Sequence, residues 1–185
     1  MALRKILTEH NKFLREKSLT VEEVNEDLQK LMDDMLETMY AAPGIGLAAI
    51  QVGVPKRVIV LDIEWCNKSE STSDEKQVER KNPMYFVNPE IIVKSKNNST
   101  YEEGCLSVPG QFAEIYRPDK CHVKYLDYYG QPKELVAEGM LATCIQHEID
   151  HLEGILFIDY LSQLKKSMIV KKLAKQKEQL DRIVI

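Results

Sequence analysis

The segment His147-Glu148-Ile149-Asp150-His151 constrains this chain more than any other stretch of its sequence. Residues four positions apart lie on one face of a helix, so an H-E-x-x-H segment presents two imidazoles one turn apart with a carboxylate beside them. That arrangement is typical of a site for a divalent metal ion, although a polar helix with solvated histidines is the alternative. The surrounding apolar pattern predicts a helix from Met140 to about Leu152, ending before Gly154.

A third metal ligand has to come from elsewhere in the chain, because a catalytic site ordinarily takes three protein ligands and leaves one position for water. The longer H-E-x-x-H-x-x-G-x-x-H pattern is excluded, since its last position is Phe157. A downstream carboxylate, Asp159 or Glu178, is possible in principle. A thiolate is the better candidate, and Cys105 is favoured over Cys144 because it follows a predicted strand in a turn of small residues.

Helical periodicity is also clear near both ends of the chain. Thr20 and Glu23 form a potential capping box, and apolar residues then recur at helical spacing up to the stop at Pro43. Another helix is predicted from Ser162 to about Arg182. The sequence predicts strands at 57–63, 85–87, 91–95, 121–126 and 133–137. This order lacks the alternation of a doubly wound sheet, so the predicted class is α+β, with antiparallel sheets around a central metal-binding helix and further helices toward both termini.

The composition is that of a folded globular protein. With 185 residues, 44% of them hydrophobic and 29% charged, the sequence predicts a single domain over residues 1–185. Met1 to Lys12 lacks the apolar stretch of a secretory signal, and no segment is apolar enough to cross a membrane. The four cysteines do not form a compact disulfide framework, so we expect reduced thiols. A cytoplasmic protein is the resulting expectation.

Two segments differ in composition from the rest of the chain. Residues 67–82 are rich in Ser, Glu, Lys and Gln, and they predict a surface loop. Residues 163–185 hold seven basic and two acidic residues, which gives this tail a formal charge of +5. The remainder then carries −9 within a total of −4. The sequence therefore predicts a basic C-terminal helix on an acidic body.

Three segments together resemble the motifs of the peptide deformylase family in their order and approximate spacing. They are Gly44-Ile45-Gly46-Leu47-Ala48-Ala49-Ile50-Gln51, Glu103-Gly104-Cys105-Leu106-Ser107 and Gln146-His147-Glu148-Ile149-Asp150-His151. Three ordered motifs are much more specific than an isolated H-E-x-x-H segment. The resemblance implies an enzyme that removes the formyl group from the N-terminal formylmethionine of newly made polypeptides and releases formate. It also implies one divalent metal ion bound by Cys105, His147 and His151.

The chemistry that the resemblance implies is a metal-assisted hydrolysis. A metal-bound hydroxide attacks the formyl carbon, while Glu148 takes the proton of the water and later delivers it to the leaving amine. The oxyanion that forms is stabilised by the side-chain amide of Gln51 and the backbone N–H of Leu106. All three residues lie in or next to the quoted motifs.

By the same resemblance, an apolar pocket holds the side chain of formylmethionine. The positions that correspond to the substrate site are Ile45, Gly46, Gly104, Met140, Thr143 and Cys144. Two positions depart from the family pattern. Ile50 stands where a proline is usual, which is expected to loosen a turn. Phe112 stands where many relatives have an arginine that contacts the substrate backbone, which is expected to weaken the grip on the peptide.

The identity of the metal ion is less constrained than its ligands. Two nitrogens, one sulfur and an open position suit zinc, whereas the resemblance implies ferrous iron. The expected ion is Fe²⁺ in the cell, with Zn²⁺, Ni²⁺ or Co²⁺ in purified protein.

The basic C-terminal helix has two interpretations. It could be a solvated amphipathic helix that packs through Leu161, Leu164, Met168, Leu173 and Leu180. Its positive charge could also dock on ribosomal RNA, which the resemblance allows. Formylmethionyl nascent polypeptides are the expected substrates, and neither a membrane nor DNA is an expected partner.

Two other functions fit the metal motif. A structural zinc protein would close the site with Cys144 as a fourth ligand, and Glu148 and Gln51 would then have no role. A metallopeptidase acting on ordinary amide bonds would differ from a deformylase only in the size of its pocket.

Overall fold

The computed structural model describes residues 2–65 and 81–183, with side chains described as far as residue 179. The loop predicted over 67–82 therefore lies almost entirely outside the described residues. In chain order, the described elements are η1 (Lys12–Arg15), α1 (Glu26–Ala41), β1 (Gly46–Ala48), η2 (Ala49–Val52), β2 (Val58–Leu61), β3 (Met84–Lys94), β4 (Asn98–Cys105), β5 (Val108–Pro118), β6 (Lys120–Leu126), β7 (Pro132–Glu138), α2 (Gly139–Leu152), η4 (Phe157–Tyr160) and α3 (Gln163–Ile183).

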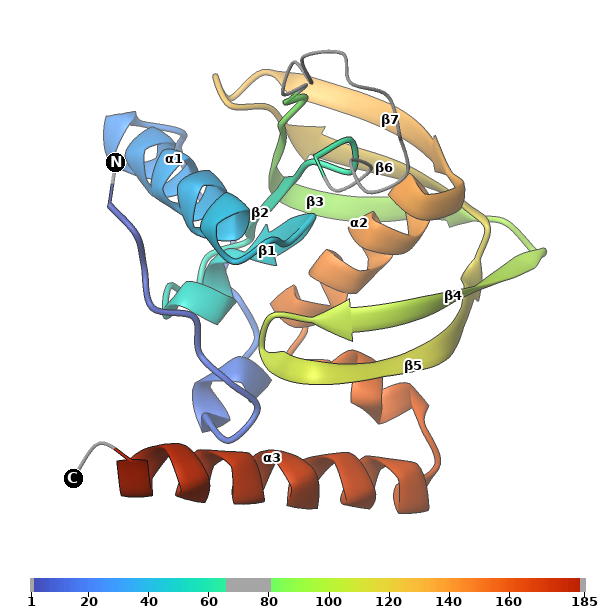
Figure 1. Cartoon of the computed structure of the whole chain (residues 1–185). Coiled ribbons are helices and arrows are strands. Elements are labelled where there is room, and N and C mark those ends of the chain that lie inside the picture. The colour runs from blue at the N-terminus through green and yellow to red at the C-terminus, as the bar shows by residue number, and fades with distance from the viewer. Residues whose placement is uncertain (1, 66–80, 184–185) are drawn as a thin grey trace, which may run out of the picture.

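The strands form two antiparallel sheets. One sheet has five strands in the order β1-β2-β3-β6-β7, and the other is the two-stranded ribbon β4-β5. The helix α2 lies between them and contacts strands of both sheets, whereas α1 packs on β1 and β2, and α3 runs alongside β5 (Figure 1). The α+β class with antiparallel sheets around a central helix is thereby confirmed.

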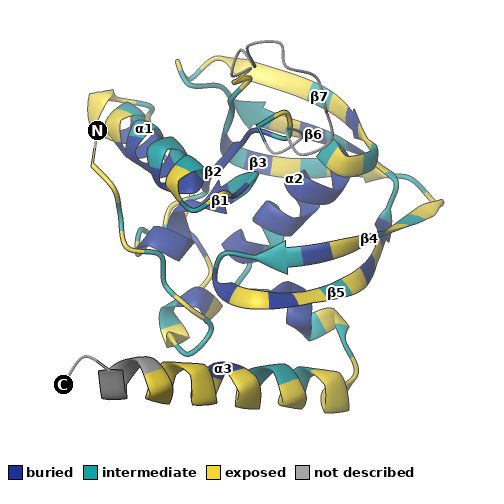
Figure 2. Cartoon of the chain, viewed as in Figure 1, coloured by how far each residue is buried: buried dark blue, intermediate teal, exposed yellow. Residues whose placement is uncertain are grey.

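Enclosure from both sides buries α2 more completely than α3, as Figure 2 shows. Seven consecutive residues, 142–148, are buried, although they include polar and charged side chains. A buried polar group costs free energy unless it has a partner. A helix that keeps such groups in the middle of the molecule therefore needs partners or ligands for them.

The first helix begins later than the sequence predicts. The capping box at Thr20 and Glu23 is not formed, and α1 instead starts at Glu26, with the Asn25 side chain accepting a hydrogen bond from the backbone N–H of Leu28. Val21 is held outside the helix because Asn88 both accepts from its N–H and donates to its carbonyl, each at 2.8 Å. Tertiary hydrogen bonds have overridden a local capping signal.

The strand predictions are correct for β2, β6 and β7 and incomplete elsewhere. The segments at 85–87 and 91–95 belong to one strand, β3, which continues through Pro89 by register shifts against β6. The sequence indicates a strand before Cys105 without bounds and does not indicate β5 at all. In β5 the usual alternation is inverted, because polar Gln111 and Arg117 are buried whereas Phe112 and Tyr116 are exposed, and this hides the signal of a strand.

The C-terminal helix forms as predicted, but only part of the predicted set of apolar residues packs against the body. Leu164 is 73% and Met168 63% exposed, so they do not contribute to the core. Leu173 is buried and Leu161 packs partly against the same cluster, both as predicted, and Ile169 and Val170 join them. The side chain of Leu180 lies outside the described part. The contacts of α3 with β5 and η4 determine which of its faces is buried.

Candidate metal centre and active-site cavity

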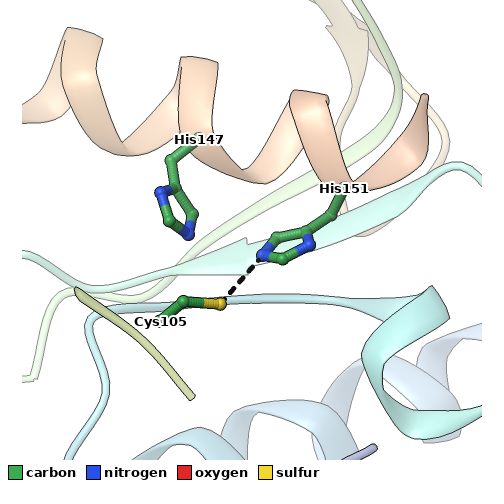
Figure 3. Close-up of side chains that lie close together, drawn as sticks. All are labelled: Cys105, His147 and His151. Carbon is green, nitrogen blue, oxygen red and sulfur yellow. Dashed lines mark hydrogen bonds between the residues drawn. The ribbon is translucent and has the colours of Figure 1, made fainter. Parts of the chain in front are cut away.

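Three side chains converge between α2 and the ribbon (Figure 3). His147 and His151 project from one face of α2, and Cys105 stands at the end of β4. Their ligand atoms all lie within 4.8 Å of one another, and Sγ of Cys105 is 3.2 Å from Nε2 of His151. Within the described residues, no further Cys, His, Asp or Glu joins this group. One thiolate and two imidazoles in this proximity fit the donor set of a zinc or ferrous ion.

His147 is oriented by a carboxylate on β4. Its Nδ1 lies 2.8 Å from Oε2 of Glu103, and since a carboxylate only accepts, Nδ1 carries the proton. The lone pair of Nε2 is thereby left for a metal, the usual arrangement around a ligating histidine. Although burial raises the pKa of Glu103, hydrogen bonds from His147 and Arg117 hold it below its usual value.

Glu103 is itself held by a buried arginine. Nε and Nη2 of Arg117 donate to its two oxygens at 2.5 and 3.0 Å, while Nη1 donates to Asp150 at 2.7 Å. The Tyr160 hydroxyl also donates to Asp150 at 2.9 Å, and its ring faces the guanidinium. A cation that is only 4% exposed is compensated by two carboxylates, so this network fixes β4 to α2 behind the ligands.

The pKa values of His147 and His151 are shifted in opposite directions. Burial lowers the pKa of His151 well below its usual value, and its Nδ1 has no hydrogen-bond partner in the described part of the chain. Burial opposes protonation of His147 too, but hydrogen bonds with Cys105 and Glu103 raise its pKa well above the usual value. A metal that binds here has to displace the second proton of His147, so binding couples to pH.

Glu148 is a buried carboxyl group without a complete set of partners. It is 5% exposed, and its Oε2 accepts no hydrogen bond from any residue that the structure describes. Burial raises its pKa to about 7, which places its proton exchange close to neutrality. Gly46 of β1 lies against it, and a Cβ on Gly46 would collide with Oε1 of Glu148. The absence of a side chain at position 46 therefore makes room for the carboxyl group.

Gln51 reaches the same region from η2. Its Oε1 accepts the backbone N–H of Ala48 at 2.8 Å, and its Nε2 donates to the Ser107 hydroxyl at 3.0 Å. The same Nε2 lies 3.6 Å from Sγ of Cys105, and the Ser107 N–H also donates to that sulfur at 3.4 Å. Two N–H groups therefore face the sulfur and hold it in place.

A cavity of about 470 Å³ opens beside the three converging side chains. All the residues to which the resemblance gives a role in catalysis or substrate binding line it: Ile45, Gly46, Gln51, Gly104, Leu106, Met140, Thr143, Cys144 and Glu148. Phe112 lines it as well, and its ring lies so close to Gly104 that a Cβ there would be 2.5 Å from a ring carbon. The structure thus gathers the predicted residues around one cavity.

Ile50 is placed differently from Phe112. It is fully buried in the core and does not line the cavity. The turn around it is closed by hydrogen bonds from the Gly53 N–H to the Ile50 carbonyl and from the Leu7 N–H to the Gln51 carbonyl. An aliphatic side chain at this position fills the core beneath the first motif.

Sequence reasoning assigns no role to Glu103 and Arg117. For Glu103 a signal exists, because residues two positions apart share a face of a strand, so it can lie beside Cys105. For Arg117 there is none, since its partners come from β4 and α2 and their proximity arises only from the tertiary fold.

A family model described as polypeptide deformylase matches residues 3–167. The chain belongs to this deformylase family. The peptide deformylase of Pelagibacter ubique is 61% identical over 187 residues, covering 100% of both proteins, and that of Maricaulis maris is 56% identical over 182 residues, covering 98% of each. The crystal structure of peptide deformylase from Ehrlichia chaffeensis in complex with actinonin has a TM-score of 0.85 and 41% identity, covering 95% of this chain and 98% of that one.

Peptide deformylases are metalloenzymes that act on formylmethionyl polypeptides, so the chain is a hydrolase of N-terminal processing. Its candidate metal group consists of Cys105, His147 and His151. In the part of the chain that the structure describes, no helix has the length and apolar character to span a membrane.

Proposed function

We propose that Cys105, His147 and His151 hold the catalytic ion of this deformylase and that Glu148 is its acid/base, within one catalytic domain over residues 1–185. One observation carries the proposal: a buried carboxyl group lacking a partner for one oxygen lies on the same cavity as a convergent Cys-His-His group. Formylated nascent chains are made on ribosomes, so we place the enzyme in the cytoplasm.

The donor set favours an ion that accepts both sulfur and nitrogen. We propose Fe²⁺ in the cell and occupancy by Zn²⁺, Ni²⁺ or Co²⁺ after purification, because such a site does not exclude these ions. A divalent ion here supplies an acidified water molecule and polarises the formyl oxygen. The Glu103 carboxylate keeps His147 in the tautomer that binds, and Ser107 and Gln51 direct N–H groups at the sulfur.

Glu148 moves the proton in the proposed reaction. Its carboxylate takes a proton from the attacking water, whose oxygen becomes bonded to the formyl carbon. The same carboxyl group then donates that proton to the methionine nitrogen as the C–N bond breaks. Formate and a free α-amine are the products. A pKa of about 7 in the metal-free protein suits a group that performs both transfers.

Gln51 and Leu106 are the proposed donors to the oxyanion. The Gln51 amide is fixed through its oxygen by Ala48, so its Nε2 stays beside the sulfur. One N–H of this nitrogen is engaged by Ser107, and the other makes only a long contact to sulfur that a developing oxyanion can replace. The backbone N–H of Leu106 follows the ligand Cys105 directly.

The methionine side chain has an apolar part of the cavity available. Ile45, Met140, Thr143 and Cys144 are the proposed walls, and Gly46 and Gly104 permit the substrate backbone to approach from two sides. A closed structural zinc site is disfavoured, because Cys144 lies on the cavity and outside the metal group.

Formate release from formyl-Met-Ala-Ser by iron-loaded protein tests the activity. The metal content of two variants distinguishes a three-ligand site from a four-ligand site that includes Cys144. In a three-ligand site, Cys105→Ser should lose most of the ion whereas Cys144→Ser should keep it. Equal loss in both variants would indicate a four-ligand structural site. Release of amino acids from unformylated peptides at a comparable rate would instead identify a metallopeptidase.

We also propose that α3 docks on ribosomal RNA. Its exposed lysines support this: they are Lys165, Lys171, Lys172, Lys175 and Lys177. Lys166 differs from them because it pairs with Asp159 at 2.6 Å. Exposed cations on an otherwise acidic chain create the local attraction to phosphates that such docking needs.

A further inference from the structure

Residues 2–9 form a segment that belongs to none of the three motifs. The segment precedes η1, has no helix or strand of its own, and runs from α1 past η2 (Figure 1). At its start, the N–H groups of Ala2 and Arg4 donate to the Asp34 carboxylate and the Thr38 hydroxyl, at 2.7 and 2.9 Å. The Arg4 guanidinium also donates to Asp34. We call residues 2–9 the strap, because α1 holds one end of it.

The other end of the strap is bonded to two of the motifs at the cavity. The N–H of Leu7 donates to the carbonyl of Gln51, and the N–H of Glu9 donates to the carbonyl of Ser107, both at 2.8 Å. Gln51 lies on η2, and Ser107 follows Leu106 in the turn between β4 and β5. Gln51 and Ser107 are buried, so each of these carbonyl groups needs a partner within the protein.

The two residues that the strap binds are also bonded to each other. Nε2 of Gln51 donates to the hydroxyl of Ser107 at 3.0 Å, although the two residues are 56 positions apart in the sequence. The strap, Gln51 and Ser107 therefore form a closed ring of three hydrogen bonds. The ring includes one proposed oxyanion donor, the Gln51 amide, and the residue that follows the other, Leu106. The spacing between the two donors thus depends on the strap.

We propose that the strap is a positioning element, whose Leu7 and Glu9 N–H groups fix the Gln51 amide and the Leu106 N–H at the spacing that the oxyanion requires. The inference rests on the proposed function, because it takes these two groups as the oxyanion donors. Such donors stabilise a transition state only when they are held in place beforehand. None of residues 2–9 lines the cavity, so the strap acts on turnover and leaves substrate binding unchanged.

Replacing a single backbone amide by an ester removes one N–H and keeps every side chain. Esters introduced through the α-hydroxy acids that correspond to Leu7 and Glu9 each remove one of the two bonds. The matched control is an ester at Lys5, whose N–H forms no hydrogen bond with a described residue. On formyl-Met-Ala-Ser, the Leu7 and Glu9 esters of the iron-loaded protein should each have a kcat about tenfold lower than the Lys5 ester. KM and iron content should be the same in all three.

A double-mutant cycle separates positioning of Gln51 from a general loosening of the fold. Gln51→Ala should lower kcat about 100-fold, because it removes one oxyanion donor. The Leu7 ester should then cause no further loss in the Gln51→Ala protein, since the group that it positions is gone. A tenfold loss in both backgrounds would overturn the inference.

A second readout needs no activity. Oε1 of Gln51 accepts the N–H of Ala48, so exchange of that amide proton reports whether the side chain stays in place. In the metal-free protein, exchange at Ala48 should be about tenfold faster in the Leu7 ester than in the Lys5 ester. Equal exchange in the two proteins would overturn the inference.

The kinetic results also distinguish failure of this inference from failure of the proposed function. If Gln51→Ala lowers kcat but neither ester at Leu7 nor at Glu9 does, the strap has no positioning role and the proposed function stands. If Gln51→Ala retains full kcat, the proposed role of Gln51 is wrong, and the inference is overturned with it.

Discussion

Oε2 of Glu103 lies 2.8 Å from Nδ1 of His147, and this contact joins the ribbon to the metal-binding helix. It sets the tautomer of His147, a proposed ligand, and through Arg117 it links this histidine to Asp150 one helical turn away. The metal group is therefore positioned by a buried polar network as well as by the helix that carries both histidines.

Replacing Glu103 should weaken metal binding. Glu103→Gln keeps the shape of the side chain but removes the charge that holds Nδ1–H of His147, and loss of such a partner typically costs 10- to 100-fold in metal affinity. Zinc affinity measured by competition with a chelator checks this. Glu102→Gln, one residue away and exposed, is the control and should bind as the unmodified protein does. Equal affinities in both variants would show that the network does not act on the metal.

The metal-free protein should respond to Glu148→Gln in a pH-dependent way. The pKa of Glu148 rises from 4.5 to about 7 on folding, so its contribution to stability is fully present below pH 4.5 and is lost as the pH rises through about 7. The neutral variant should match the unmodified protein near pH 4 and exceed it by roughly 3 kcal/mol at pH 8. Urea unfolding at both pH values measures the difference. Glu90→Gln, at an exposed position, should show no such trend.

A side chain at position 46 should disable the acid/base without removing the metal. In Gly46→Ala the new methyl group collides with Oε1 of Glu148 and with the Leu61 side chain, so the carboxyl group has to shift. We expect a fall in kcat of about 100-fold with unchanged metal content. Steady-state kinetics on formyl-Met-Ala-Ser and elemental analysis of the same sample provide the check. Loss of the metal in this variant would mean that the substitution perturbs the ligands instead.

Neutralising α3 should separate ribosome binding from catalysis. Truncation at Lys171 is a poor test because it removes Leu173, which is buried against the ribbon. Lys165, Lys171, Lys172 and Lys175 are exposed, and changing all four to Gln should weaken ribosome binding about tenfold or more while sparing turnover of a short formylated peptide. The control changes Lys5, Lys12, Lys56 and Lys96, which are equally exposed elsewhere. If both variants bind ribosomes equally well, docking does not use this helix.

The sequence was sufficient for the parts of the structure that have a local signal. The apolar pattern around His147 and His151 predicts the helix that carries both, and runs of strand-forming residues predict β2, β6 and β7. The start of α1 could not be predicted in the same way, because Asn88 binds the Val21 backbone from 67 residues away. The packing face of α3 was predicted only in part: Leu173 is buried as expected, whereas Leu164 and Met168 are exposed, because the elements that the helix contacts leave no signal in its own sequence.

The residues of the candidate site also divide into those that the sequence predicts and those that only the fold reveals. The three motifs indicate which residues should gather at the cavity, because each motif is contiguous in the sequence. Arg117 carries no such signal, as its role follows from Glu103 and Asp150 lying on two different elements beside it. Residues that position a site from a distance become visible only when the fold is known.

Glu148 is proposed to transfer protons at a metal ion that other residues bind. The most direct test measures formate release from formyl-Met-Ala-Ser, per bound iron, by the unmodified protein and by Glu148→Gln, both purified without oxygen. We expect the two proteins to bind equal amounts of iron and the variant to release formate at a rate at least about 100-fold lower. Full activity in Glu148→Gln, or no formate from fully iron-loaded unmodified protein, would contradict this proposal.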